Sequence, residues 1–308
     1  MDKPLVVLIT GSSRGFGFLA SKTLAAKGYT VFASMRDPAG RNASARDQLM
    51  ELGKRQSVRV VDLNVSDDAS VERAVAEVIQ AAGHIDVLVN NAGFSIGGFT
   101  EAFSLEQAHR LFETNFFGVV RMNRAVAPHM RRRGQGLIIH ITSTSGRSVV
   151  PGMGIYAATK FATEALAEVY RYELSPFGVD SVILEPGPYA TEVFDKNELP
   201  ADWDRLKDYE KLWQKMSAVF KTMEAKCEDP QEVADTILRI IETPAGERPL
   251  RQITGPAVAS LHDLNDTSTR VQREILEYLG ISDWLGIPPS PQRSSTLRFG
   301  WGGGRKLR

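Results

Sequence analysis

The sequence has little cysteine and no net charge. Its 308 residues include one cysteine, Cys227, and its 37 basic side chains balance 37 acidic ones. One cysteine excludes an intramolecular disulfide and a multi-cysteine metal cluster. Without a basic excess, a protein that holds nucleic acid by neutralising phosphates is not expected. No apolar run approaches the ~18 residues of a membrane span, and the run at residues 5–9 is shorter than a signal-peptide core. We therefore expect a soluble, cytoplasmic protein with no bound metal, no membrane span and no nucleic-acid partner.

The neutral total conceals a basic end. Residues 286–308 contain five basic side chains and no acidic one, so the rest of the chain is mildly acidic. This segment is rich in Pro, Ser, Gly and Arg, a composition that cannot bury an apolar core. We expect it to be a flexible basic tail.

Short apolar runs alternate with helical patterns along most of the chain. Residues 5–9 (LVVLI) are apolar and partly β-branched, which predicts a strand buried on both faces. Apolar residues recur at helical spacing between Asp67 and Gly83. Further strands are predicted at 31–33, 58–61, 85–89, 137–141 and 179–184, with long helices at about 104–132 and 155–175. This alternation predicts right-handed βαβ units in a three-layer α/β fold, with a doubly wound parallel sheet of about seven strands.

Residues 10–17 (TGSSRGFG) follow the first predicted strand and open a helix. The glycines permit a tight turn and close approach of a ligand, and the helix N-terminus offers N–H groups to a pyrophosphate. A turn without a ligand is the alternative, but the strand before and the helix after supply the context of a dinucleotide motif. The pattern predicts a single Rossmann-fold domain over residues 1–285. Its expected cofactor contacts here are Gly11, Ser13, Arg14, Gly15, Phe16 and Gly17.

Two neighbouring residues favour different dinucleotides. Asp37 lies ~20 residues beyond the glycines, where a carboxylate accepts from the ribose hydroxyls and favours NAD. Arg36 directly precedes it, and Arg14 lies within the glycine-rich turn. Two guanidinium groups that converge on the adenosine ribose suit a 2′-phosphate, because arginine makes bidentate, charge-assisted bonds to phosphate. NADP(H) is therefore the favoured cofactor, and NAD(H) held by Asp37 is the alternative.

Tyr156 and Lys160 stand four residues apart at the start of a predicted helix, which puts them on one face. A free tyrosine titrates near pH 10, too high for ready proton exchange at neutral pH. An adjacent ammonium group favours the phenolate, so Tyr156 could act as acid or base on an alcohol or carbonyl. A Tyr-x-x-x-Lys pair alone is common on solvated helix faces, and its meaning depends on its surroundings.

Polar side chains follow two of the predicted strands. Residues 142–146 (TSTSG) end one strand and residues 90–93 (NNAG) end another, at the edge where open parallel sheets bind ligands. Together with TGSSRGFG, Asp62, Asn115 in TNFFG, Ser143, YAATK, and Pro186-Gly187 with Thr191, they resemble the short-chain dehydrogenase/reductase family over residues 4–195. Within it, residues 34–37 (SMRD) and 185–188 (EPGP) are similar to 17-beta-hydroxysteroid and retinol dehydrogenases and to bacterial ketoreductases.

The resemblance implies a role for each matching residue. Ser143 would bind the substrate oxygen and Tyr156 transfer a proton, while Lys160 holds the nicotinamide ribose and Asn115 supports a relay water. Ser145 is the rival to Ser143, but its spacing from Tyr156 fits the family less well. Asp62 would accept from the adenine amino group. The other implied cofactor contacts are Arg36, Leu63, Asn91, Ala92, Gly93, Pro186, Gly187 and Thr191.

Aromatic residues gather after residue 188. Trp203, Leu206, Trp213, Met216, Phe220 and Met223 form one stripe if their segment is helical. We expect a lid over an apolar substrate at about 189–226, and an ordinary helix that covers the sheet is the alternative. None of the five histidines falls within this segment. The predicted substrate contacts are Ser95, Ser145, Val149, Tyr189, Phe194, Trp213 and Phe220.

The leading hypothesis is an NADP(H)-dependent carbonyl reductase or secondary-alcohol dehydrogenase that acts on a small-molecule substrate. The alternatives are an NAD-dependent dehydrogenase of the same family and a non-catalytic, dinucleotide-binding regulatory protein. Family members pair subunits through the helices around 104–132 and 155–175, which implies a homodimer or homotetramer. Arg131, Arg132 and Arg133 end a predicted helix, where cations complement the helix dipole, so a solvated helix end is favoured over a nucleic-acid patch.

Overall fold

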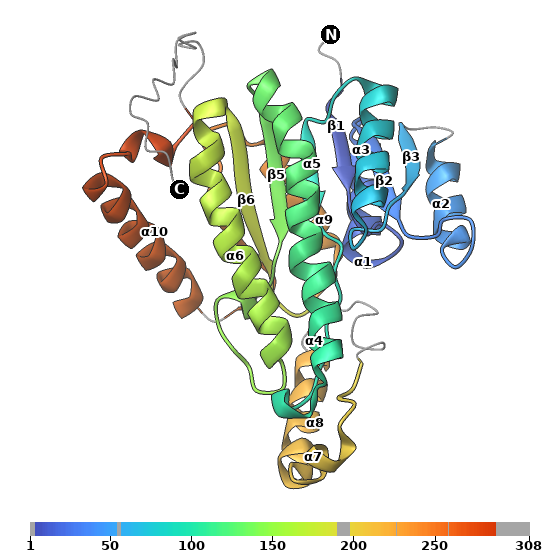
Figure 1. The fold of residues 1–308 in the computed structure, drawn as a ribbon, viewed down its shortest axis with the longest axis vertical. Helices are drawn as coiled ribbons and strands as arrows, with labels where there is room; N and C mark the ends of the chain where they lie inside the picture. The colour runs from blue at the N-terminus through green and yellow to red at the C-terminus, as the bar shows by residue number, and fades with distance from the viewer. Residues whose placement is uncertain (1–3, 54–56, 190–197, 226, 258, 288–308) are drawn as a thin grey trace, which may run out of the picture.

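The computed structural model describes residues 4–53, 57–189, 198–225, 227–257 and 259–287. Within these ranges one sheet of seven parallel strands has the order β3-β2-β1-β4-β5-β6-β7. The strands are β1 Val6–Ile9, β2 Thr30–Met35, β3 Val58–Asp62, β4 Val87–Asn90, β5 Gly136–Ile141, β6 Val179–Pro186 and β7 Arg251–Thr254. The predicted doubly wound parallel sheet is confirmed (Figure 1).

Helices cover both faces of this sheet, which explains why the strands are continuous apolar runs. Val7 and Ile9 of β1 point into one core and Val6 and Leu8 into the other, and all four are buried. The first core packs on α1 Gly15–Ala26, α2 Ala43–Gly53 and α9 Gln231–Glu242. The second packs on α3 Asp68–Ala82, α5 Gly118–Arg133 and α6 Gly154–Leu174. Helix α10 Ser260–Tyr278 follows β7, and its Asn265 donates to Glu185 of β6 (Figure 1).

The carboxyl ends of the strands meet at one edge of the sheet. The chain runs outward from β1 to β3 and then crosses to β4, so the strand order reverses between β1 and β4. Open parallel sheets bind ligands in the crevice at such a reversal. The glycine-rich turn, residues 91–93 and residues 142–146 all follow strands at this edge. Helices α7 Trp203–Lys207 and α8 Glu210–Ala225 lie at the same end of the molecule (Figure 1).

Shorter elements complete the described chain. Helix α4 Leu105–Phe112 continues through a π-helical turn, Glu113–Phe117, into α5, so the predicted long helix at 104–132 is present with an irregular centre. The 3-10 turns are η1 Thr100–Ala102, η3 Thr144–Gly146, η4 Ser175–Phe177 and η5 Ser282–Leu285. None of the helices in the described ranges is long and apolar enough to cross a membrane. Most of the predicted basic tail, residues 288–308, lies outside the described residues.

Candidate active site

The glycine-rich turn between β1 and α1 lies against the loop that follows β4. Gly11 has a φ of +71°, and a Cβ there would lie 2.8 Å from the Cα of Ala92. A Cβ at Gly17 would lie 2.5 Å from Nδ2 of Asn91. That amide nitrogen donates to the carbonyl oxygens of Thr10 (2.8 Å) and Gly11 (3.0 Å). Close packing between the two loops therefore requires these glycines, and α1, with no acidic residue in its first turn, offers its N–H groups to an anion.

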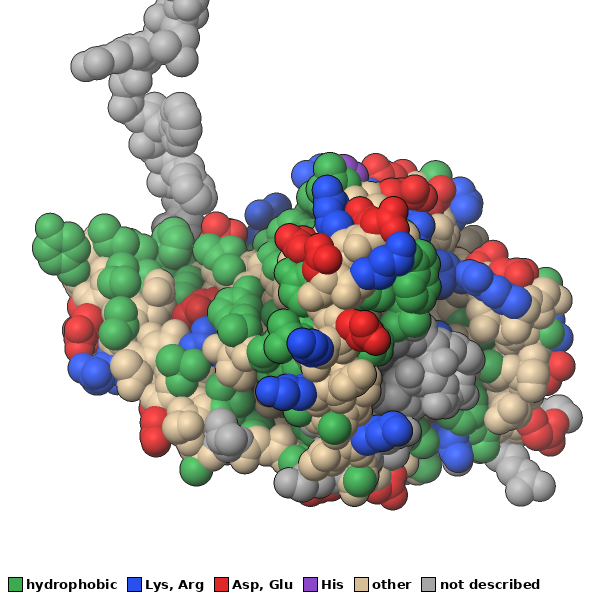
Figure 2. Space-filling view, turned by 90° about the horizontal axis from the view of Figure 1, so that it is seen from below, with side chains coloured by type: hydrophobic (Ala, Val, Ile, Leu, Met, Phe, Trp, Pro, Cys, Tyr) green, Lys and Arg blue, Asp and Glu red, His purple; other side chains and the backbone are tan. Residues whose placement is uncertain are grey.

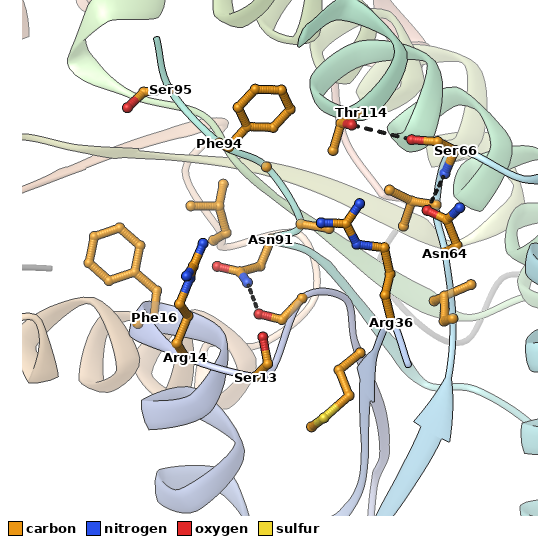
Figure 3. Close-up of a pocket in the computed structure, with 18 of the residues that line it drawn as sticks. Ser13, Arg14, Phe16, Arg36, Asn64, Ser66, Asn91, Phe94, Ser95 and Thr114 are labelled. Carbon is orange, nitrogen blue, oxygen red and sulfur yellow. Dashed lines mark hydrogen bonds between the residues drawn. The ribbon is translucent and has the colours of Figure 1, made fainter. Parts of the chain in front are cut away.

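A cavity of about 720 Å³ opens at this edge of the sheet (Figure 3). Its volume suits a cofactor-sized ligand. Of the predicted site residues, its lining contains Gly11, Ser13, Arg14, Gly15, Phe16, Arg36, Leu63, Asn91, Ala92, Gly93, Ser95, Tyr156 and Lys160. The lining also contains residues that the sequence reasoning missed: Met35, Arg41, Asn42, Asn64, Val65, Ser66, Phe94, Arg110, Glu113, Thr114, Ile141 and Thr142. Many of these come from strand ends or the loops just beyond them, and that position was the available signal.

Three arginines meet at one end of the cavity. Arg14, Arg36 and Arg41 all contribute to its lining, and Figure 3 shows Arg14 and Arg36 extending into it from the turn before α1 and from the residue after β2. Burial lowers the pKa of Arg36, and the positive charges of Arg41 and Arg14 lower it further. Like charges so close together repel one another, so an anion bound between them would be stabilised by all three.

The two acidic residues beside these arginines are engaged with the backbone. Asp37 has a φ of +48°, a conformation that aspartate tolerates in turns. Its carboxylate accepts from the backbone N–H groups of Gly40 and Arg41, both at 3.0 Å. Asp62 accepts from the N–H of Asp37 at 3.2 Å. Neither carboxylate is among the residues that line the cavity, so the turn after β2 presents Arg41 and not Asp37.

Asn115 occupies the centre of the π-helical turn between α4 and α5. Its Oδ1 accepts from the N–H of Phe94 (3.0 Å), and its Nδ2 donates to the carbonyl oxygen of Phe94 (2.9 Å) and lies 3.2 Å from Oγ1 of Thr159. A Cβ at Gly93 would lie 3.0 Å from Asn115 Oδ1. Such π-helical turns are frequent at functional sites. Asn115 therefore fixes the loop after β4, and its support of a relay water stays a prediction.

Tyr156 and Lys160 line the cavity, and Ser143, which is not among the lining residues, lies beside Tyr156. The hydroxyl of Ser143 lies near enough to that of Tyr156 to lower its pKa, and it accepts from the N–H of Ser145 at 3.1 Å. The Nζ of Lys160 lies 5.6 Å from the centre of the Tyr156 ring and donates to the carbonyl oxygen of Ile141 at 3.0 Å. Helix α6 thus presents Tyr156 and Lys160 toward the loop that carries Ser143. The structure brings this predicted set together.

Withdrawal from water sets the protonation of both titratable groups. Desolvation raises the pKa of Tyr156 to about 12, although the hydrogen bond with Ser143 acts in the opposite direction. Desolvation lowers the pKa of Lys160 to about 8, against the negative charge of Glu164. Burial therefore outweighs the effect of Ser143 on the phenol, and the lowering of the Tyr156 pKa by Lys160 stays a prediction. Tyr156 is a protonated phenol at neutral pH.

Two of the predicted substrate residues lie on the inner side of α8. The rings of Trp213 and Phe99 have centroids 6.1 Å apart, and a Cβ at Gly152 would lie 3.1 Å from the Phe220 ring. The predicted stripe is divided between α7 and α8, and Trp203 on α7 is 60% exposed. Val149 is 72% exposed. Thr191 and Phe194 lie outside the described residues.

Tyr189 is a core residue, which differs from its prediction as a substrate contact. Its side chain is 2% exposed and packs edge-on against Phe16, with 5.6 Å between ring centroids. Its hydroxyl donates to Glu232 (2.7 Å) and lies 2.9 Å from Oγ1 of Thr254. These contacts occupy its polar end within the protein. The adjacent Pro186-Gly187 turn is fixed to β7 by the N–H of Gly187, which donates to the carbonyl oxygen of Thr254 at 2.9 Å.

Comparison with known proteins agrees with this geometry. The family model of short chain dehydrogenases matches residues 5–201. The chain is 32% identical over 259 residues to a 3-ketodihydrosphingosine reductase of Bacteroides thetaiotaomicron. The alignment covers 84% of this chain and 91% of the relative. It is 36% identical over 262 residues to retinol dehydrogenase 8 of Homo sapiens. That alignment covers 82% of this chain and 81% of the relative.

A solved structure supports the same assignment. The alcohol dehydrogenase of the archaeon Thermococcus sibiricus, complexed with 5-hydroxy-NADP, matches with a TM-score of 0.67 and 27% identity over 83% of this chain and 100% of that chain. The chain therefore belongs to the short-chain dehydrogenase family and is an oxidoreductase that acts on CH–OH or keto groups.

Proposed function

We propose that the protein is an NADP(H)-dependent carbonyl reductase or secondary-alcohol dehydrogenase in which Tyr156 exchanges a proton with the substrate oxygen. The observation that carries this proposal is the Ser143 hydroxyl next to that of Tyr156, with Lys160 beside the Tyr156 ring, where Tyr156 and Lys160 line the cavity. A carbonyl oxygen placed there would meet two hydroxyl donors at once. This arrangement suits an oxygen that gains negative charge during the reaction.

The protonation states support reduction at neutral pH. Because the pKa of Tyr156 is raised to about 12, its phenol retains the proton that it would donate to the carbonyl oxygen. Ser143 would stabilise the same oxygen by a hydrogen bond, and Lys160 would act through its charge. A bound nicotinamide dinucleotide would supply the hydride in reduction and accept it in oxidation.

The three arginines support NADP(H) over NAD(H). A 2′-phosphate between Arg14, Arg36 and Arg41 would receive charge-assisted hydrogen bonds and relieve their mutual repulsion. Asp37, the residue that would favour NAD, is instead held by the backbone of its own turn. The Thermococcus relative was solved with 5-hydroxy-NADP, which is consistent with the proposed role of these arginines.

The lid segment supports a bulky, apolar substrate. Trp213 and Phe220 face the loops beside the cavity, and the rings of Phe99 and Tyr209 stack at 4.3 Å between centroids. Two relatives are named for retinol and 3-ketodihydrosphingosine. Figure 2 shows the lid end, where hydrophobic, acidic and basic side chains lie intermixed. If residues 189–226 form a lid, cofactor and substrate together should protect them from limited proteolysis, whereas a fixed covering helix would be cleaved equally with and without ligands.

Turnover on a panel of ketones, aldehydes and secondary alcohols, with NADPH and NADH in parallel, tests the proposal. The expected result is reduction of apolar ketones with a preference for NADPH. A preference for NADH would support the dehydrogenase that binds NAD through Asp37. Tight NADPH binding without turnover on any compound would contradict the proposal and support a regulatory dinucleotide-binding protein.

The remaining expectations become part of the same proposal: one cytoplasmic domain over residues 1–285 that assembles as a homodimer or homotetramer. Large apolar side chains are exposed on the helices implied to pair, namely Phe117 before α5 and Phe161 and Val169 on α6, each at least 40% exposed. Sedimentation of the full chain measures the subunit number. A monomer at micromolar concentration would contradict this part of the proposal.

A further inference from the structure

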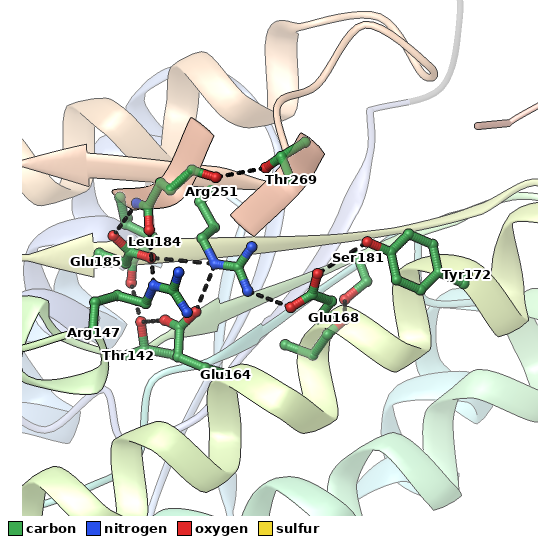
Figure 4. Close-up of polar contacts among 12 residues, drawn as sticks. Thr142, Arg147, Glu164, Glu168, Tyr172, Ser181, Leu184, Glu185, Arg251 and Thr269 are labelled. Atoms are coloured by element: carbon green, nitrogen blue, oxygen red, sulfur yellow. Dashed lines mark hydrogen bonds and ion pairs between the residues drawn. The ribbon is translucent and has the colours of Figure 1, made fainter. Parts of the chain in front are cut away.

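A group of charged side chains lies next to the loop of residues 142–147, here called the catalytic loop (Figure 4). Its charged members are Arg147, Glu164, Glu168, Glu185 and Arg251. They come from the loop after η3, from α6, from β6 and from β7. Nothing in the family resemblance assigns a role to them.

Glu164 connects this group to the active site. It follows Lys160 by one turn of α6 and is 2% exposed. Its Oε1 accepts from Oγ1 of Thr142 at 2.7 Å, and Thr142 directly precedes Ser143 in the chain. A Cβ at Gly146 would lie 3.1 Å from Cγ of Glu164. The segment on both sides of Ser143 therefore rests on Glu164.

Arg251 fixes the other oxygen of Glu164. Its Nε donates to Oε2 of Glu164 at 3.0 Å, and its Nη2 lies 2.5 Å from Oε2 of Glu168. Its side chain is 3% exposed. Because Arg251 begins β7, the carboxylate one turn after Lys160 is held by a strand from the far end of the chain. Glu164 is thus fixed at both oxygens.

The group contains more carboxylates than guanidinium groups. Glu185 lies 3.6 Å from Arg251 through Oε1 and accepts from Nδ2 of Asn265 at 2.8 Å through Oε2. Arg147 donates to Oδ1 of Asn265 at 2.8 Å, and its charge also acts on Glu185. Burial raises the pKa of Glu164 well above the ordinary value, and the charge of Glu185 raises it further, while Arg251 and the hydrogen bond from Thr142 act in the opposite direction. The charge of Glu164 in turn favours the ammonium form of Lys160, which burial disfavours.

We propose that Glu164 is a positioning residue for the proposed reaction, which fixes the backbone of Ser143 through Thr142 and keeps Lys160 charged through its own carboxylate. The two parts are separable, because one depends on a hydrogen bond and the other on a charge. The proposal rests on the proposed function, but the protonation of Lys160 can be measured without turnover.

Four variants separate the two parts. Glu164→Gln removes the charge and keeps the shape of the side chain, so the pKa of Lys160 should fall by about one unit. The rate of ketone reduction, which is expected to decline at high pH, should then decline at a pH lower by a similar amount. Glu164→Asp keeps the charge but shortens the reach to Thr142, so kcat should fall while the Lys160 titration is retained. Thr142→Val removes the donor and should lower kcat roughly tenfold, again without a shift of the titration.

Glu168→Gln is the matched control. Glu168 lies one turn further along α6 and pairs with the same arginine, but its hydrogen bonds are to Arg251 and Tyr172 and not to the Ser143 segment. This variant should leave the Lys160 titration and kcat within about twofold of the wild type. Thermal unfolding of each variant identifies any that fail to fold. If the Glu164 variants do not fold, Thr142→Val still tests the hydrogen bond between Thr142 and Glu164, because it leaves the buried charges unchanged.

The experiment is an NMR titration of Lys160 in full-length protein labelled at lysine Cε, assigned with Lys160→Met, together with pH–rate profiles of the same variants. The expected result is a lowered Lys160 pKa in Glu164→Gln alone and a lowered kcat in Glu164→Asp and Thr142→Val. An unchanged titration in Glu164→Gln, an equal shift in Glu168→Gln, or an unchanged kcat in Thr142→Val would overturn the proposal. Absence of turnover in the wild type with the expected Lys160 shifts would contradict the proposed function but retain the effect of Glu164 on Lys160.

Discussion

Two groups of charged side chains flank the active site, and they differ in sign and in burial. Arg14, Arg36 and Arg41 line an open cavity and carry an excess of positive charge. Glu164 and its neighbours lie next to the catalytic loop, with Glu164, Glu185 and Arg251 almost fully buried, and carboxylates exceed guanidinium groups there. Excess charge beside a cavity can be balanced by a ligand, whereas enclosed excess charge must be balanced by protons or by neighbouring residues. The first group therefore indicates what the protein binds, and the second affects how its own residues titrate.

Removal of the Tyr156 hydroxyl should have the largest effect on turnover. It should impair the chemical step but not cofactor binding by the arginines. In Tyr156→Phe, ketone reduction should fall roughly 10³-fold because the proton donor is lost. The dissociation constant of NADPH should change by less than about threefold, because the arginines are intact. Steady-state kinetics and fluorescence titration measure the two quantities. Equal turnover in the variant and the wild type would remove Tyr156 from the mechanism.

The two serines of the catalytic loop should behave differently. Ser143→Ala should lower kcat roughly 10²-fold, because the substrate oxygen loses one hydrogen-bond donor. Ser145→Ala is the matched control, since the contact of Ser145 with Ser143 is made by its backbone N–H, which the substitution retains. Its kcat should stay within about threefold of the wild type. The reverse order would assign the substrate contact to Ser145.

Substitutions at the other end of the cleft should affect the cofactor and not the chemical step. Arg36→Gln and Arg41→Gln should each raise the dissociation constant of NADPH about tenfold and leave that of NADH nearly unchanged, because only NADPH carries the 2′-phosphate. Arg59→Gln, on β3 outside the cavity lining, is a control of equal charge change. Similar losses for NADPH and NADH would show that the arginines do not select the phosphate.

The smallest expected effect is a dependence on pH. Ketone reduction should be nearly constant from pH 6 to 7 and should decline above about pH 8, where Lys160 loses its proton. The direction follows from its lowered pKa: the ammonium form, which we infer to be active, is present below that value and lost above it. NADPH-dependent rates at saturating ketone, measured in buffers of constant ionic strength, give the profile. A rate that rises between pH 8 and 9 would contradict this role of the ammonium group.

Local sequence was sufficient for the parts of the site that are close together in the chain. The glycine-rich turn predicted the dinucleotide end because strand, turn and helix are contiguous. Tyr156 and Lys160 were found for the same reason, since helical spacing places them on one face. Arg41 was missed because its position depends on the left-handed conformation of Asp37, which the sequence allows but does not require.

Contacts between segments that are distant in the chain could not be predicted from local sequence patterns. Tyr189 belongs to an aromatic-rich segment, but Glu232 on α9 accepts its hydroxyl and makes it a core residue. Arg251 and Glu164 are separated by 87 positions, so no local periodicity joins them. The raised pKa of Tyr156 could not be predicted for a similar reason. Helical spacing identifies the neighbouring lysine, but the burial that raises the pKa depends on the whole fold.

In the proposed reaction a hydride passes from NADPH to a carbonyl carbon while Tyr156 supplies the proton. The most direct test uses NADPH deuterated at C4 of the nicotinamide ring, in either stereochemical position, with an apolar ketone that the wild type reduces. We expect an alcohol with one deuterium on its carbinol carbon from one of the two labelled cofactors, formed roughly 10³-fold more slowly by Tyr156→Phe. An alcohol without deuterium from both labelled cofactors, or labelled product formed at an equal rate by the Tyr156→Phe variant, would contradict the proposed reaction.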